Sequence, residues 1–360
     1  MISAIPDLSR RSMLGAVSAL SVGGVLLPIV GGSAASAASN MAPSVSSVVA
    51  DDTIETTAVK VTDALEGAYG RHEGLRRNHT KGVGVLGHFI GHRDAAEFSR
   101  SSLFSGRKIE VIGRFSLAGG NPAASDLENT PRGLALEFRL PDGELHHMTM
   151  LHTPMFFAAA PKTFLDKFIA LKIEDNTGKA DPALFKSYLA THPDNDAQVK
   201  FLAATTPPTS YARCPFFGIH TFKFTDKQER TTLIRFRFVP HDGVANLSHD
   251  EVESYPKDFL AAALKTRISQ GPVAWDMMVT IGEPGDPEVD PTVLWPSERR
   301  EIKAGTLVLD RVIPDAQAGS YKINFDPLML SDGVAATKDP ILLFRSTSYA
   351  LSHERRLREI

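Results

Sequence analysis

Eight segments in which large apolar residues alternate with small or polar ones constrain the fold of this chain most. They form two groups of four, with Gly, Pro, Asp and Asn between the segments. The first group is KGVGVLGHFIGH, IEVIGRFSLAG, RGLALEFRL and ELHHMTMLHT, and the second is IHTFKFTD, TTLIRFRFVP, AWDMMVTIGE and AGTLVLDRVI. Such alternation predicts β-strands, and Pro-Asp-Gly at residues 141–143 predicts a hairpin turn between two of them.

Segments with a helical pattern lie between and around these groups. Residues 161–172, 181–192 and 196–205 separate the two groups, and residues 255–269 fall within the second. Two more helices are expected, one over residues 57–70 and one over the C-terminal stretch from Asp339. Because the strands are grouped instead of alternating singly with helices, an antiparallel sheet is favoured. We predict an α+β protein, an eight-stranded antiparallel β-barrel with helical insertions and a C-terminal helix.

The N-terminus has the pattern of an export signal. A twin arginine, Arg10 and Arg11, precedes an apolar run from Met13 to Val30, and small residues follow with Ala-Ser-Ala at 35–37. This order is typical of a twin-arginine signal peptide, and it favours cleavage over a stable membrane anchor. We therefore expect residues 1–38 to be a signal peptide read by the twin-arginine export machinery. The mature protein is expected to be periplasmic or otherwise exported.

The rest of the chain reads as one domain after a short linker. Residues 39–57 are rich in Ser, Ala, Val and Asp without periodicity, and residues 58–360 are expected to form the domain. The formal net charge of −3 provides no basic field for nucleic acid, so we expect no nucleic-acid partner. Cys214 is the only cysteine, which excludes an internal disulfide and a thiolate metal cluster.

A cation and a phenol lie four residues apart in the C-terminal stretch DPILLFRSTSYALSHERRLREI. On a helix, Arg345 and Tyr349 would meet on one face. One interpretation is structural, with the tyrosine packed in the core and the arginine extended to the surface. The other is that the guanidinium favours the ionised phenol, which is a hard anionic ligand and one of the few side chains that ligate haem iron. The pair alone leaves both open.

His79 precedes a glycine-rich strand in RRNHTKGVGVLGHF. Taken alone, a single histidine at such a place is more often structural than functional. The glycines at 82, 84 and 87 form no phosphate loop, because they lack the strand-turn-helix context. They would, however, let a bulky group lie against the strand.

Seven motifs, in order along the chain, together resemble the haem catalases, and most closely the small catalase-related peroxidases. They are NHTKGVGVLGHF, GRFSLAGG, PRGLALEF, TPMFFAAAPKTF, FFGIHTFKF, DPTVLWP and RSTSYALSHERR. The resemblance implies a catalase-like domain with non-covalent haem b as cofactor. It implies that His79 is the distal histidine that moves a proton between peroxide oxygens, and that Ser116 orients it. It also implies that Tyr349 ligates the iron and that Arg345 keeps the Tyr349 side chain ionised, as a phenolate.

The resemblance further assigns residues at the edges of the cofactor. Arginines are implied to pair with the haem propionates, a task for which the guanidinium fork is well shaped; they are Arg76, Arg114 and Arg356. Aromatic residues are implied to line the haem or its access channel, although plain core packing is an equal alternative for each; they are Phe156, Phe157 and Phe164.

One position departs from the pattern of the catalases. They usually carry Asn-Asn before Thr-Pro-x-Phe-Phe, and the first amide helps to hold peroxide. This chain has Leu151 and His152 there, so the amide is absent unless a register shift brings His152 to its place.

We therefore expect a haem peroxidase that reduces an organic hydroperoxide or hydrogen peroxide with a small-molecule reductant. The alternatives are a true catalase, which dismutates hydrogen peroxide to water and oxygen, and a haem-binding protein without enzymatic activity. A monomer or small homo-oligomer is expected.

Overall fold

A computed structural model describes residues 48–359, and the predicted signal peptide, residues 1–38, lies outside this range. Ten strands are present among the described residues: β1 Gly82–Gly91, β2 Lys108–Leu117, β3 Arg132–Arg139, β4 Leu145–Leu151, β5 Phe216–Phe217, β6 Phe222–Thr225, β7 Thr231–Pro240, β8 Val273–Ile281, β9 Glu301–Pro314 and β10 Val334–Ala336. The helices are α1 Val48–Tyr69, α2 Arg93–Ala96, α3 Pro161–Ala170, α4 Pro182–Thr191, α5 Asp196–Ala203, α6 His249–Ser254, α7 Leu260–Ser269 and α8 Pro340–Leu357.

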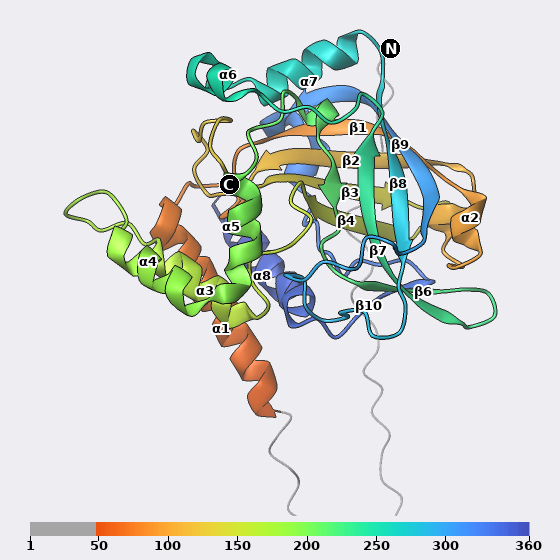
Figure 1. The fold of residues 1–360 in the computed structure, drawn as a ribbon, viewed down its shortest axis with the longest axis horizontal. Coiled ribbons are helices and arrows are strands. Elements are labelled where there is room, and N and C mark those ends of the chain that lie inside the picture. The colour runs from red at the N-terminus through yellow and green to blue at the C-terminus, as the bar shows by residue number, and fades with distance from the viewer. Residues whose placement is uncertain (1–47, 360) are drawn as a thin grey trace, which may run out of the picture. The chain divides into compact units, whose positions relative to one another are not determined.

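Eight of the strands close into an antiparallel barrel, which confirms the predicted fold class. The neighbours run β7-β5-β4-β3-β2-β1-β9-β8, and β8 pairs with β7 to complete the ring. β6 pairs with the first residues of β7, which β5 does not reach, and β10 pairs with β6 outside the ring. Figure 1 shows the barrel strands together on one side of the domain, with α7 along one end.

One strand of the ring differs from the prediction. Sequence alternation predicted β6 as a barrel strand, whereas the ring runs through β5, only two residues long. β5 and β6 lie along the same edge of β7, and β5 pairs with Phe238 and Arg237 while β6 pairs nearer the start of β7. Between β5 and β6, Ile219 adopts φ 53°, a left-handed conformation that interrupts a strand. A strand broken by one such residue leaves too short a pattern to detect.

The interior of the barrel is filled by side chains. On β2, Val111 and Phe115 point inward, and Leu134 and Leu136 do the same on β3. They belong to a buried cluster that also contains Trp275 and other aromatic and aliphatic residues from all around the ring. Because side chains alternate along a strand, Arg114 and Ser116 face outward. Any site built on these strands must therefore lie outside the barrel.

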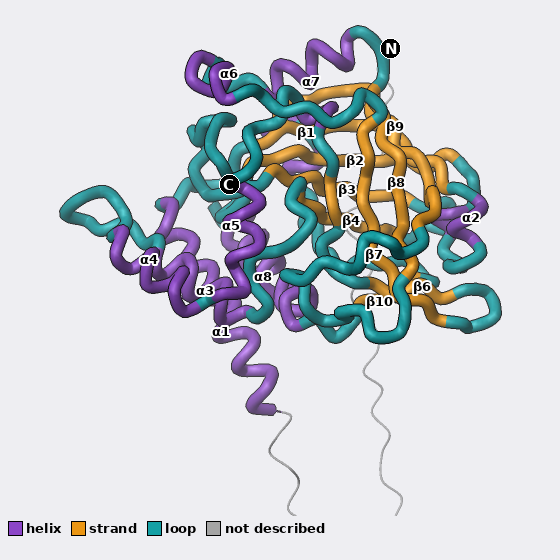
Figure 2. The backbone as a smooth tube through the Cα atoms, viewed as in Figure 1, coloured by secondary structure: helices purple, strands orange, loops and turns teal. Residues whose placement is uncertain are grey.

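Helices cover this outer face. α1 packs against α3 and α8, and a second buried cluster joins these helices to Leu151 on β4 and to Ile219 between β5 and β6. Figure 2 shows α1, α3, α4, α5 and α8 gathered beside the strands. α1 begins at Val48, within the segment 39–57 that was predicted to be a linker. Within the described residues, no helix combines the length and apolar character that crossing a membrane requires.

Candidate active site

A cavity of about 560 Å³ lies between the outer face of β2–β4 and the helices. Residues from the loop before β1, from the three strands and from α1, α3, α4, α5 and α8 line it. All ten residues predicted for the site line this one cavity: Arg76, His79, Arg114, Ser116, Phe156, Phe157, Phe164, Arg345, Tyr349 and Arg356. Residues that are up to 280 positions apart in the sequence are thus brought together.

His79 is held in place at both its ring and its backbone. Its Nδ1 lies 2.9 Å from Ser116 Oγ on β2. Its φ of 54° is unusual for a residue other than glycine, and neighbouring groups secure this conformation. The Asn78 side chain accepts from the His79 amide at 2.9 Å, and Arg114 donates to the His79 carbonyl at 2.7 Å. A Cβ on Gly133 would approach the imidazole to 3.0 Å, so glycine leaves room for the ring.

The His79 imidazole is neutral at ordinary pH. Burial lowers its pKa to about 3, and the positive charges of Arg114, Arg345 and Arg76 add to this effect. A neutral imidazole can accept a proton, which is the state that a general base requires.

Helix α8 brings Tyr349 and Arg345 to the cavity on one helix face, as their four-residue spacing predicted. Arg345 Nη2 donates to Tyr349 Oη at 2.9 Å and to Thr149 Oγ1 on β4 at 2.7 Å. The guanidinium carbon lies 5.3 Å from the centre of the Tyr349 ring. The arginine therefore directs a charged donor at the phenol oxygen.

Two buried residues that the sequence did not reveal fix Arg345. Its Nη1 donates to His220 Nε2 at 2.8 Å, so His220 must carry its own proton on Nδ1, which donates to Asp339 Oδ2 at 2.6 Å. Asp339 also caps α8, because its other oxygen accepts from the amides of Ile341 and Leu342. The Asp339-Pro340 pair predicts the start of a helix from sequence alone. Nothing in the sequence linked it to His220.

The three predicted propionate partners differ in what they already bind. Arg114 makes a two-point ion pair with Asp315, at 2.8 and 2.7 Å, in addition to its bonds to the loop that carries His79. Arg76 donates to the carbonyls of Ser320 and Ile323. Arg356 has two buried guanidinium nitrogens, Nε and Nη2, that have no hydrogen-bond partner among the described residues. Burial and the charges of Arg114 and Arg356 hold the pKa of Arg76 well below its usual range.

The predicted aromatics form one connected group on the helical side. Phe157 packs against Phe156 and Phe164, with ring centres 4.5 and 5.3 Å away. Phe156 also lies 6.4 Å from the ring of His220. The group gives the cavity an apolar wall next to the Arg345 network.

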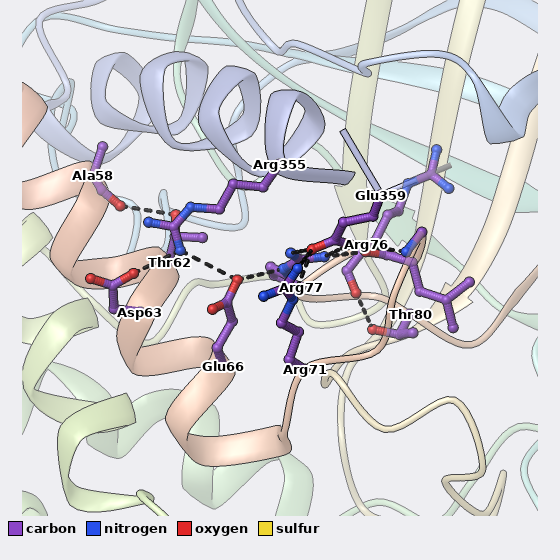
Figure 3. Close-up of polar contacts among 12 residues, drawn as sticks. Ala58, Thr62, Asp63, Glu66, Arg71, Arg76, Arg77, Thr80, Arg355 and Glu359 are labelled. Atoms are coloured by element: carbon purple, nitrogen blue, oxygen red, sulfur yellow. Dashed lines mark hydrogen bonds and ion pairs between the residues drawn. The ribbon is translucent and has the colours of Figure 1, made fainter. Parts of the chain in front are cut away.

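A cluster of ion pairs ties the end of α8 to the loop that carries Arg76 and His79. Glu359 Oε1 accepts from Arg77 at 2.5 Å and from Arg71, and Oε2 accepts from the Gly74 amide at 2.9 Å. Arg77 in turn donates to Glu66 on α1 at 2.6 Å. Figure 3 shows these side chains meeting from α1, the loop and the C-terminal end.

Comparison with known proteins agrees with this geometry. Residues 72–359 match the sequence pattern of the catalase family. The chain belongs to the catalase family. This confirms the resemblance predicted from the seven motifs.

Within the catalase family, the chain is similar to proteins of its own size. It is 46% identical over 302 residues to a catalase-related peroxidase of Synechococcus elongatus, covering 84% of this chain and 89% of that protein. It is 30% identical over 297 residues to a catalase-related peroxidase of Mycolicibacterium paratuberculosis, covering 82% and 93%.

Solved structures of catalases share the fold. A bacterial catalase superposes with a TM-score of 0.73 at 22% identity, covering 89% of this chain and 63% of that one. Catalase A of Saccharomyces cerevisiae gives a TM-score of 0.72 at 24% identity, covering 80% and 62%.

Members of the catalase family typically bind haem, and the cavity fits such a group. Two buried nitrogens of Arg356 lack a hydrogen-bond partner within the part of the chain that the structure describes, and a propionate carboxylate would supply one. The Phe156 and Phe157 wall suits the faces of a large aromatic ring, and Tyr349 offers an oxygen ligand. These residues could hold haem without any covalent attachment.

The structure keeps Leu151 at the position where the sequence departs from the catalase pattern. Leu151 lines the cavity and pairs in regular register with Gly133 on β3. His152 is not brought into the cavity by a shift. Its Nδ1 accepts from the Arg132 amide at 3.0 Å, and its ring packs near Phe201. An apolar side chain therefore stands where catalases usually have an amide.

Proposed function

We propose that this protein is a haem peroxidase that reduces an organic hydroperoxide or hydrogen peroxide with two electrons from a small external donor. The observation that carries the proposal is the presence, in one cavity, of the oriented neutral His79 and of the Arg345–Tyr349 pair. A non-enzymatic haem carrier would need the tyrosine but no oriented base. In the overall reaction, ROOH, two electrons and two protons give ROH and water.

The residues of the chain supply the proton chemistry of this reaction. With the Nδ1 proton donated to Ser116, the Nε2 lone pair of His79 can accept the proton of a peroxide. The resulting imidazolium can return the proton to the departing oxygen. Bound haem would supply the redox-active iron at which the O–O bond is broken.

Tyr349 would bind the iron from the α8 side of the cavity, and Arg345 would support the tyrosine in this role. The guanidinium donates to the phenol oxygen, so it favours the anionic ligand state. His220 and Asp339 keep the guanidinium oriented, since both are fully buried and hydrogen-bonded in series.

Leu151 favours a peroxidase over a true catalase. Dismutation requires a second hydrogen peroxide to be gripped and oxidised, and a leucine offers no hydrogen bond for that task. An electron donor that reacts at the edge of the cofactor has no such requirement.

The test compares two activities of the purified, haem-loaded protein. We expect donor oxidation by cumene hydroperoxide to outrun oxygen release from hydrogen peroxide. Leu151→Asn should raise oxygen release about tenfold or more, because a polar contact in a transition state is worth about 1–3 kcal/mol. Leu151→Met is the control of similar size. Fast oxygen release by the wild type, unchanged in Leu151→Asn, would assign the protein as a catalase.

We also propose that the cofactor is haem b and that the protein is exported. The single cysteine and the absence of a Cys-x-x-Cys-His motif in the sequence support non-covalent haem. The twin arginine supports export. Extraction of the haem into acidified butanone tests the first point. Loss of the exported form in an Arg10→Lys, Arg11→Lys variant tests the second.

A further inference from the structure

A partly buried lysine on α3, Lys167, is not used by the chemistry described above. Lys167 lines the cavity, and its Nζ lies 3.8 Å above the centre of the Phe157 ring. Among residues 48–359, its ammonium has one hydrogen bond, to the side-chain oxygen of Asn195 at 3.3 Å. No carboxylate of the described residues forms an ion pair with it.

The surroundings of Lys167 are unusual for a charged side chain. The same wall carries Leu171, Phe185, Val199 and Leu202, which offer no polar group to an ammonium. Burial lowers the pKa of Lys167 to about 8, with no opposing contribution from an acidic group, so the side chain still carries its charge at neutral pH. A buried charge is costly unless something pairs with it. The contact with Phe157 meets only part of this need.

Lys167 is separate from the arginines assigned to the propionates. Arg114 and Arg356 each lower the pKa of Arg76, which places those three charges close together. None of them perturbs Lys167, whose pKa is changed by burial alone. The cavity therefore has two cationic points: the arginine group between β2 and the end of α8, and the single ammonium on α3.

We propose that Lys167 binds the carboxylate of an amphiphilic hydroperoxide, one with a hydrocarbon chain and an acid group. This inference rests on the proposed peroxidase function and names its substrate class. The apolar wall formed by α3, α4 and α5 takes the hydrocarbon chain, and the ammonium takes the acid. Asn195 holds the ammonium in place from behind.

The chemistry of the wall favours a monocarboxylate over a phosphate. A phosphate monoester carries up to two charges and has three oxygens to satisfy. Lys167 is one cation, and the lining residues Leu171, Phe185, Val199 and Leu202 on this side of the cavity are apolar. A single carboxylate matches a single ammonium, as in a charge-assisted hydrogen bond.

The first test measures binding without turnover. Octanoate and octan-1-ol, which differ only in the charged group, are titrated into the haem-loaded protein by calorimetry. We expect octanoate to bind about tenfold or more tightly than the alcohol to the wild type, and equally weakly to Lys167→Met. Lys167→Arg should keep the preference. Equal binding of both ligands to the wild type overturns the proposal, and this comparison needs no variant.

The matched control is Lys200→Met on α5, which removes the same charge from a side chain that is 79% exposed and outside the cavity lining. It should keep the preference for octanoate. If Lys200→Met loses the preference as Lys167→Met does, the effect is one of net charge and the proposal fails. Haem content is measured in every variant, and haem loss in Lys167→Met would make the lysine a cofactor contact instead.

The second test separates this inference from the proposed function. With a fatty-acid hydroperoxide, Lys167→Met should raise KM about tenfold or more and leave kcat nearly unchanged. With uncharged cumene hydroperoxide, both constants should stay at the wild-type level. An equal change for both peroxides overturns the role of Lys167. If the wild type turns over neither peroxide, the peroxidase function fails, while the octanoate comparison still reports on the lysine.

Discussion

The contacts of Arg345 determine the chemistry on the side of the cavity formed by α8. One guanidinium nitrogen is directed to His220, and the other is shared by Thr149 and Tyr349. Burial lowers the pKa of His220 to about 4 despite its hydrogen bond to Asp339, so the ring stays neutral and can accept from the arginine. A protonated His220 would repel the guanidinium and displace it. The orientation of the arginine toward the phenol thus depends on a neutral histidine behind it.

Replacement of the phenol oxygen tests the ligand role. Tyr349→Phe keeps the ring but removes the atom that would bind iron, so we expect loss of stable haem binding. The measurement is the haem absorption band after reconstitution and gel filtration. Tyr188→Phe is the matched control, because that buried hydroxyl has no hydrogen-bond partner in residues 48–359 and lies outside the cavity lining. Normal haem content in Tyr349→Phe would remove the tyrosine from the iron.

The elements show which parts of the fold a sequence reveals. Long strands such as β1 and β2 were predictable, because ten residues of alternation leave a strong local pattern. The two residues of β5 leave none. The contact of His220 with Asp339 joins positions 119 residues apart, and the pairing of β10 with β6 brings their segments together. His79 and Tyr349 were found through motifs, which carry information about a site that local patterns do not contain.

At the level of elements, Glu359 connects the end of α8 to the loop that carries His79. Its side chain is 7% exposed, and that of its partner Arg77 is 3% exposed. The hydrogen bonds from Arg77 outweigh burial and hold the pKa of Glu359 at about 2, so the carboxylate is charged. Loss of the Glu359 charge leaves Arg77 with Glu66 as its remaining carboxylate partner, and it weakens the attachment of Arg71 and of the Gly74 amide to the end of α8.

We therefore predict that Glu359→Gln lowers the thermal unfolding midpoint clearly and weakens haem retention, since the loop also carries Arg76. Differential scanning calorimetry and haem transfer to an acceptor protein measure the two effects. Glu354→Gln on α8 is the control, because Glu354 is exposed and its partner Arg358 is exposed as well. Similar behaviour of the two variants would show that the Glu359 pairs do not hold the loop.

For the whole domain, neutral histidines with lowered pKa values link stability to pH. Burial lowers the pKa of four of them, to about 3 for His79, His146 and His152 and to about 4 for His220. Each would titrate near 6.5 in the unfolded chain. Between these values the unfolded state binds more protons than the folded one, so stability rises with pH. Their contribution is fully present above about 6.5 and is lost as the pH falls toward 4.

We predict that the free energy of unfolding falls steeply below about pH 6.5, by about 1.4 kcal/mol per pH unit for each such histidine. Urea titrations followed by circular dichroism at several pH values between 4.5 and 7 measure the slope. His146 tests the cause, because it lies inside the barrel beside Phe138 and accepts from the Ser331 amide, away from the cavity proposed to bind haem. His146→Gln should reduce the slope by about 1.4 kcal/mol per unit, whatever its effect on stability at pH 7. His249→Gln, at an exposed position, should leave the slope unchanged. A slope in His146→Gln equal to that of the wild type would mean that His146 does not bind its proton on unfolding, and that the acid sensitivity originates in the carboxylates.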